Sequence, residues 1–162
     1  MKKSKFNTSG GYFSAVVFPN GENSKQEPLR LSHLNKNLLT LDGRDLFHAQ
    51  CYTNTSNGTR GAGYVAVTTD TGNPNSSDTS LAQELSGSGF ARADATTKTH
   101  TNDTNSTTIE HTFTASGTVN SIVKSGTFNN ASSTTLCHEA TFTSASLISG
   151  DTLKVTWTLN LG

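Results

Sequence analysis

Two histidines are the residues whose type and spacing come closest to a chemical site. His111 and His138 each alternate with apolar residues, so each shares the apolar face of a predicted strand. With a third ligand such as His100, the pair would make a zinc or iron site. The sequence has no HxH or HxxxH spacing and places no carboxylate behind either ring. We therefore predict two partly buried histidines with structural hydrogen bonds, and no metal site.

The other residues that could be reactive are not predicted to form a catalytic site. Cys137-His138-Glu139 has the order of a nucleophile and its base, but neighbours in a strand point to opposite faces. Cys51 and Cys137 have no CxxC spacing, which favours two buried thiols while leaving a disulfide open. The charges of Asp42-Gly43-Arg44-Asp45 fit the first turn of a helix. No GxSxG elbow, P-loop or GxGxxG is present. We expect no catalytic residue and no cofactor, and hence no enzyme.

The elements that hold these residues are predicted to be strands. The last thirteen residues, GDTLKVTWTLNLG, alternate without interruption after a Gly150-Asp151 turn. Their apolar face comprises Leu153, Val155, Trp157, Leu159 and Leu161. Burying five such side chains gives roughly 8–15 kcal/mol before ordering entropy is subtracted. We expect this segment to be a structural strand with a buried Trp157. It can be either a central or an edge strand of its sheet.

Further strands are predicted at 63–69, 90–100, 107–115, 120–128 and 135–143. The last of these puts Leu136 on the same face as His138. Helical exceptions are a short helix at 44–51 and one turn that opens with the capping box Ser80/Gln83. Short strands without long helices predict a mainly β fold, an antiparallel β-sandwich of jelly-roll or Ig-like type with one or two short helices and an N-terminal arm.

Residues 1–36 differ from the sandwich domain predicted at 37–162. The run Tyr12–Phe18 reads as a strand between Gly10-Gly11 and Pro19-Asn20-Gly21, and a long polar connector follows it. An apolar strand ahead of the compact part predicts an arm that adds to a sheet edge of a neighbouring molecule. Its partner-contact residues are predicted to be Phe6, Tyr12, Phe13, Val16, Val17 and Phe18.

Composition narrows the class of protein. Only 31% of the 162 residues are apolar and 15% are charged, against typical values of about 45–50% and about 25%. Ser, Thr, Asn and Gly make up the difference, as in extracellular and virion β-proteins. The formal net charge of zero gives no electrostatic reason for a nucleic acid or membrane partner.

Five stretches between Leu39 and Leu161 together resemble small virion proteins of tailed bacteriophages. In chain order they are LDGRDLFHAQ, GYVAVTTDTG, SSDTSLAQELSGSGFARA, HTFTASGTVNSIVKSGTFNN and CHEATFTSASLISGDTLKVTWTLNL. The resemblance covers about three quarters of the chain. It implies a non-enzymatic assembly protein on the virion, a head decoration (cement) protein that binds the major capsid protein as a homotrimer.

Two alternatives stay open. One is a tail, collar or fibre component of the same kind of particle. The other is a carbohydrate-binding or adhesin module, which would need exposed aromatic side chains. Since Trp157 falls on a buried face, only Tyr12, Tyr52 and Tyr64 could serve such a module.

Overall fold

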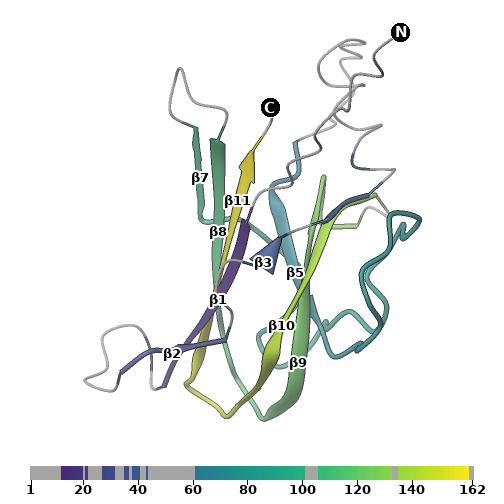
Figure 1. Ribbon diagram of the computed structural model, residues 1–162. Coiled ribbons are helices and arrows are strands. Elements are labelled where there is room, and N and C mark those ends of the chain that lie inside the picture. Colours follow the sequence, from purple (N-terminus) through teal and green to yellow (C-terminus); the bar gives the residue numbers. More distant parts are fainter. Residues whose placement is uncertain are drawn as a thin grey trace, which may run out of the picture.

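The computed structural model describes residues 12–19, 21, 27–31, 35–36, 38–40, 43, 61–100, 106–132 and 135–160. Within these residues the fold is mainly β, with two antiparallel sheets packed as a sandwich, and Gly43 is the one described residue with helical backbone (Figure 1). The described part of the chain thus contains no helix able to cross a membrane. The helix predicted at 44–51 lies outside the described residues.

The first sheet, sheet A, has the strand order β2-β1-β11-β8-β7, and β3 also pairs with β1. Its strands are β1 (Tyr12–Phe18), β2 (Leu29–Arg30), β3 (Asn35–Lys36), β7 (Thr97–His100), β8 (Ser106–Thr114) and β11 (Thr152–Asn160).

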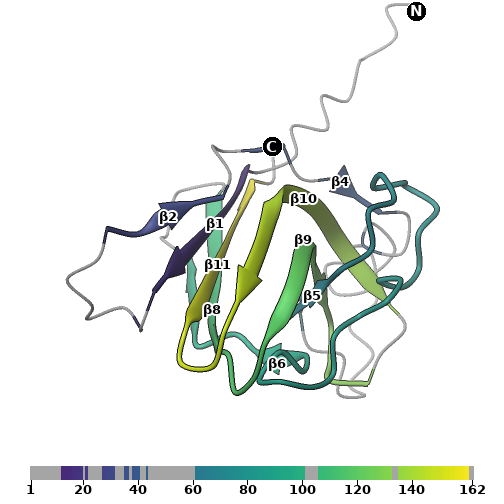
Figure 2. The same ribbon diagram turned by 90° about the horizontal axis from the view of Figure 1, so that it is seen from below.

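The second sheet, sheet B, has the order β4-β10-β9-β5-β6. Its strands are β4 (Leu38–Leu39), β5 (Tyr64–Thr68), β6 (Ala93–Asp94), β9 (Val119–Phe128) and β10 (Leu136–Leu147). Figure 2, seen from below, shows the two sheets side by side, with the segment between β5 and β6 beyond sheet B.

The terminal strand is central, and its predicted core face is confirmed from Leu153 to Leu159, whereas Leu161 lies outside the described residues. β11 pairs with β1 on one side and with β8 on the other. Trp157 is fully buried, as are Leu153 and Val155, and all three belong to the main core between the sheets. The Trp157 indole donates a hydrogen bond from Nε1 to Ser125 Oγ across the core, at 3.3 Å. The one polar atom of this large side chain therefore has a partner in sheet B.

Short segments close both sides of the sandwich by passing from one sheet to the other. On one side β3 pairs with β1 in sheet A, and β4, only two residues later, pairs with β10 in sheet B. Leu31 also links the sheets, because its N–H donates to Ala15 O and its carbonyl accepts from Thr143 N, both at 2.9 Å. On the other side β6 belongs to sheet B and β7 to sheet A.

The described residues of the predicted N-terminal arm belong to the sandwich. β1 pairs with β11 over its whole length, from Tyr12 to Phe18. Ala15 and Val17 are buried in the main core, and so is Leu31. The boundary predicted at residue 36, between an arm and the sandwich domain, is therefore wrong for β1 and Leu31, which belong to the sandwich. The pattern of β1 was read correctly, but its partner is 140 residues away in sequence, so the pairing could not be read from the chain.

Two other predictions need correction. The strand predicted at 90–100 is two short strands, because the chain changes sheets between Asp94 and Thr97. The predicted helical turn after Ser80 is also wrong: Gln83 has a φ of 51°, and Glu84 makes an isolated β-bridge to Thr68.

The face assignment of Leu136 is wrong as well. A register shift between Leu136 and His138 interrupts the alternation of β10. Leu136 consequently packs with Phe128 and Leu81 in a second apolar cluster, away from the main core that holds Ala140. An extra residue in one strand reverses the direction of the side chains before it, and the sequence pattern gives no sign of this.

Candidate functional site

The two histidines singled out in the sequence both pack against aromatic side chains. His138 is buried, its Nδ1 shares a hydrogen bond of 2.8 Å with Thr127 Oγ1, and its ring lies 6.0 Å from that of Trp157. Burial lowers the pKa of His138 to about 4, so the ring is neutral at physiological pH. His111 packs edge-on against Phe113, with ring centroids 4.5 Å apart, and burial lowers its pKa against the opposing effect of the Asp94 backbone.

A metal-binding arrangement is not found in the part of the chain that the structure describes: no three His, Cys, Asp or Glu side chains there are placed to hold an ion. Cys137 is buried beside Ala62, and its Sγ lies 3.8 Å from the Thr135 carbonyl oxygen. Cys51, its potential disulfide partner, lies outside the described residues.

The predicted partner-contact residues divide between the two faces of β1. Val17 points into the core, whereas Val16 and Phe18 are partly exposed. Tyr12 and Phe13 are held through their main chains by β11 and β3. Phe6 lies outside the described residues. Any contact of these residues with a partner stays a prediction.

The outer face of sheet B carries a second apolar cluster under the segment between β5 and β6. Leu81 from this segment packs on Ala66, Phe128 and Leu136. The contact requires Gly126 on β9, because a Cβ there would lie 2.7 Å from Leu136 Cδ1 and 3.4 Å from Leu81 Cδ1. Sheet B is therefore covered on both faces, by sheet A and by the chain's own loop.

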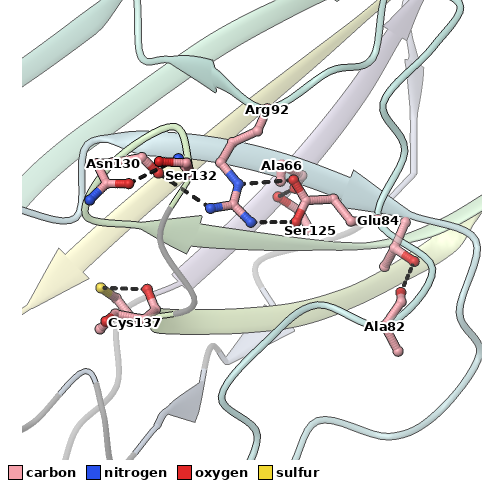
Figure 3. Close-up of polar contacts among 10 residues, drawn as sticks. Ala66, Ala82, Glu84, Arg92, Ser125, Asn130, Ser132 and Cys137 are labelled. Carbon is pink, nitrogen blue, oxygen red and sulfur yellow. Dashed lines mark hydrogen bonds and ion pairs between the residues drawn. The ribbon is translucent and has the colours of Figure 1, made fainter.

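Arg92 holds the end of this loop in place (Figure 3). Its Nε and Nη2 donate to the two carboxylate oxygens of Glu84 at 2.9 and 2.5 Å, and Nη1 donates to the Asn130 carbonyl at 3.3 Å. The guanidinium carbon lies 3.4 Å from the ring centroid of Phe128. The bidentate ion pair and the stacking both use the planar fork of arginine, which lysine lacks.

The most unusual group of side chains lies further along the same covered face. Lys124 on β9 is 3% exposed, and its Nζ lies 2.7 Å from Asp70 Oδ2 and 3.7 Å from Glu139 Oε2. Glu139 on β10 is 1% exposed, and Asp70, just after β5, is 21% exposed. A buried lysine between two carboxylates is costly unless each group is paired and hydrogen-bonded. We call Asp70, Lys124 and Glu139 the lysine cluster.

The pKa values of the two carboxyl groups in the lysine cluster are shifted in opposite directions. Burial, together with a hydrogen bond to Asp78, raises the pKa of Glu139 to about 7, although the Asn75 N–H at 2.8 Å from Oε1 and the Lys124 charge oppose this. The hydrogen bond from Lys124, supported by the Gly72 backbone, lowers the pKa of Asp70. At neutral pH, the cluster therefore holds an ionised Asp70 beside a carboxyl that is protonated about half of the time.

The residues of the lysine cluster were not among those singled out from the sequence. Lys124 is an isolated charge within the strand SIVKSGTF, which was a usable signal, since a charge among strand residues that become buried needs a partner. Its partners could not be named from the sequence, because they are set by the strand register. Thr68 on β5 pairs with Lys124 on β9, and Glu139 on β10 pairs with Gly126 on β9.

Comparisons of the chain with protein-family models, with curated proteins and with solved structures found no match.

Proposed function

We propose that this chain is a non-enzymatic structural protein of a tailed-phage virion, a decoration protein that binds the major capsid protein on the head surface and stabilises the head. The proposal starts from the five sequence stretches that resemble small phage virion proteins. It is supported by the surroundings of His138, whose Nδ1 shares a hydrogen bond with Thr127 Oγ1 and whose ring lies near that of Trp157.

The pairing of the strands shares one feature with a jelly roll. β1 pairs with β11, β4 with β10, β5 with β9, and β7 with β8. Strands from the first part of the chain thus pair, in reverse order, with strands from the last part, as they do in the jelly rolls of viral capsid proteins and lectins. β9 and β10 also pair with each other and share sheet B with β4 and β5, so the two sheets do not take alternate pairs as a regular jelly roll does.

The observation that carries the proposal is the difference between the outer faces of the two sheets. The outer face of sheet B is covered by the loop that bears Leu81. The outward side chains of β8 and β11 are partly exposed and mostly threonine, and they form rows across the two strands. They are Thr108, Glu110, Thr112, Lys154, Thr156 and Thr158, which we call the threonine face.

The threonine face suits contact with another protein. It is nearly uncharged, because Lys154 Nζ and Glu110 Oε1 neutralise each other at 2.8 Å. Val16 and Phe18 extend it with apolar surface on the neighbouring strand β1. An interface of this kind combines an apolar part with a polar part that can form hydrogen bonds. We propose that this face contacts the capsid and that the protein assembles there as a trimer.

Co-sedimentation with undecorated heads tests the proposal. We expect the native protein to sediment with heads and Thr108→Lys, on the threonine face, to bind at least tenfold more weakly. Thr79→Lys makes the same change at an exposed position of the loop over sheet B and should bind normally. Circular dichroism should show both variants folded. Native binding to isolated tails instead of heads would favour a tail, collar or fibre role, and equal binding by both variants would refute the threonine face as the contact surface.

A further inference from the structure

The lysine cluster has the composition and geometry of a site that can form a covalent cross-link. Its amine and one carboxyl are in contact, since Lys124 Nζ lies 2.7 Å from Asp70 Oδ2. Reacting atoms in near-attack geometry are about 3–3.5 Å apart, so the carboxyl carbon attached to Oδ2 is within reach. We propose that Lys124 and Asp70 join in an intramolecular isopeptide bond, with Glu139 as the proton relay.

The fold holds both reacting side chains in position. Lys124 is opposite Thr68 on the neighbouring strand, and the Thr68 hydroxyl accepts a hydrogen bond from the Asp70 N–H at 2.9 Å. That hydroxyl in turn donates to the Ala82 carbonyl, which ties the start of the loop to its far end. The Gly72 backbone also bonds the Asp70 carboxylate. Pre-organisation of this kind removes much of the entropy cost of bringing two groups together.

The reaction needs the neutral forms of the amine and of the carboxyl group, and a second carboxyl group beside the amine can assist the proton transfers. Lys124 is 3% exposed. Glu139, which is 1% exposed, places Oε2 3.7 Å from Lys124 Nζ, so a carboxyl group lies next to the reacting nitrogen. The other charged groups near it are Asp70 and Asp78, which both come from the loop.

The reaction is a dehydration that needs no further reactant. Lys124 first passes one proton to Asp70, which leaves a neutral amine beside a neutral carboxyl group. The amine attacks Cγ of Asp70 and forms the C–N bond. Glu139 takes a proton from the nitrogen through Oε2, the oxygen nearest to it, and passes this proton to the departing hydroxyl. The C–O bond breaks, one water leaves, and Glu139 ends in the state in which it began.

The cross-link would join positions 54 residues apart in sequence. It would fix the loop over sheet B to β9 by a bond that denaturants do not break. This inference rests on the lysine cluster alone and does not depend on a role in a virion.

Intact-mass measurement of the purified full-length protein tests the proposal directly. The native chain should be lighter than its sequence mass by one water. Trypsin does not cleave after an acylated lysine, so digestion should yield residues 61–92 joined to residues 99–154. Lys124→Arg keeps a positive charge but has no reactive amine of the same kind, and it should show the full sequence mass. Asp70→Asn should lose ammonia in place of water, because Cγ remains the electrophile.

The role of Glu139 has its own test. Glu139→Gln preserves the shape of the side chain but cannot relay a proton, and its cross-linked fraction should fall at least tenfold at equal incubation time. An unchanged fraction would refute the relay. A native mass equal to the sequence mass would refute the cross-link. Loss of water confined to a peptide containing Asp42-Gly43, where a succinimide can form, would refute it equally.

Discussion

His138 and Glu139 are neighbours on β10 whose pKa values are shifted in opposite directions, so replacing His138 should reveal a pH dependence of stability that the native chain hides. The folded pKa of His138 is about 4, below its ordinary 6.5. Between these values the unfolded chain holds a proton that the folded chain lacks. The contribution of His138 is therefore complete above pH 6.5 and is lost as the pH falls to 4.

Glu139 acts in the opposite sense. Its folded pKa is about 7, above its ordinary 4.5, so between these values the folded chain holds the extra proton. Its contribution is complete below pH 4.5 and is lost as the pH rises to 7. An isopeptide bond would preserve this direction, because it would remove the Lys124 charge that lowers the pKa of Glu139.

The two contributions are similar in size. Each shift is about 2.5 pH units, and at about 1.4 kcal/mol per unit each is worth about 3 kcal/mol. Between pH 4.5 and 6.5 the two slopes nearly cancel. His138→Asn removes one of them while leaving a group able to bond Thr127. The free energy of unfolding of this variant should fall by about 3 kcal/mol from pH 4.5 to pH 7.

Urea denaturation at a series of pH values measures this effect, with Trp157 fluorescence as the probe, since the chain has a single tryptophan and it is buried. Glu139→Gln is the matched variant, and its stability should rise with pH between 4 and 6.5. Curves for the native protein and His138→Asn that remain parallel over the whole range would refute the assigned pKa values and the cancellation.

Three further predictions concern the fold. Gly126→Ala should lower the free energy of unfolding by about 1–3 kcal/mol through overpacking, whereas Gly87→Ala, which meets no atom within 4 Å, should change it little; equal effects in urea denaturation would contradict the packing described. Arg92→Lys should cost about 1–3 kcal/mol through loss of the bidentate pair with Glu84, and a double-mutant cycle with Glu84→Gln should show coupling between the two positions. Deleting residues 1–18 should leave a chain without the β circular dichroism of the native protein, because Val17 and the rest of β1 belong to the core; a folded product would restore the arm hypothesis.

Local pattern was enough to find the longer strands. β5, β8, β9 and β11 lie close to their predicted positions. β8 and β11 alternate because one face of each is toward the core, whereas β5 is buried on both faces and is recognised as a short apolar run. The buried positions of Trp157 and His138 follow from the same alternation. Two-residue strands such as β2 cannot be found in this way, since they are defined only by their partners.

What the sequence could not give depends on contacts between distant segments. The pattern of β1 fits a strand in its own sheet as well as a strand on a neighbour, and the pairing with β11 decides between them. The lysine cluster is a similar case: Lys124 and Glu139 are on adjacent strands, but Asp70 reaches them only through the path of the loop after β5. Such a site depends on register, and register is not visible in one chain's alternation.

The proposed function is tested most directly by electron cryomicroscopy of undecorated phage heads incubated with the purified protein. We expect additional density on the outer capsid surface, with three copies around each binding position and the threonine face of sheet A toward the capsid protein. Absence of added density at saturating protein concentration would contradict the assignment to the head. Density in which sheet A faces the solvent would contradict the contact surface proposed here.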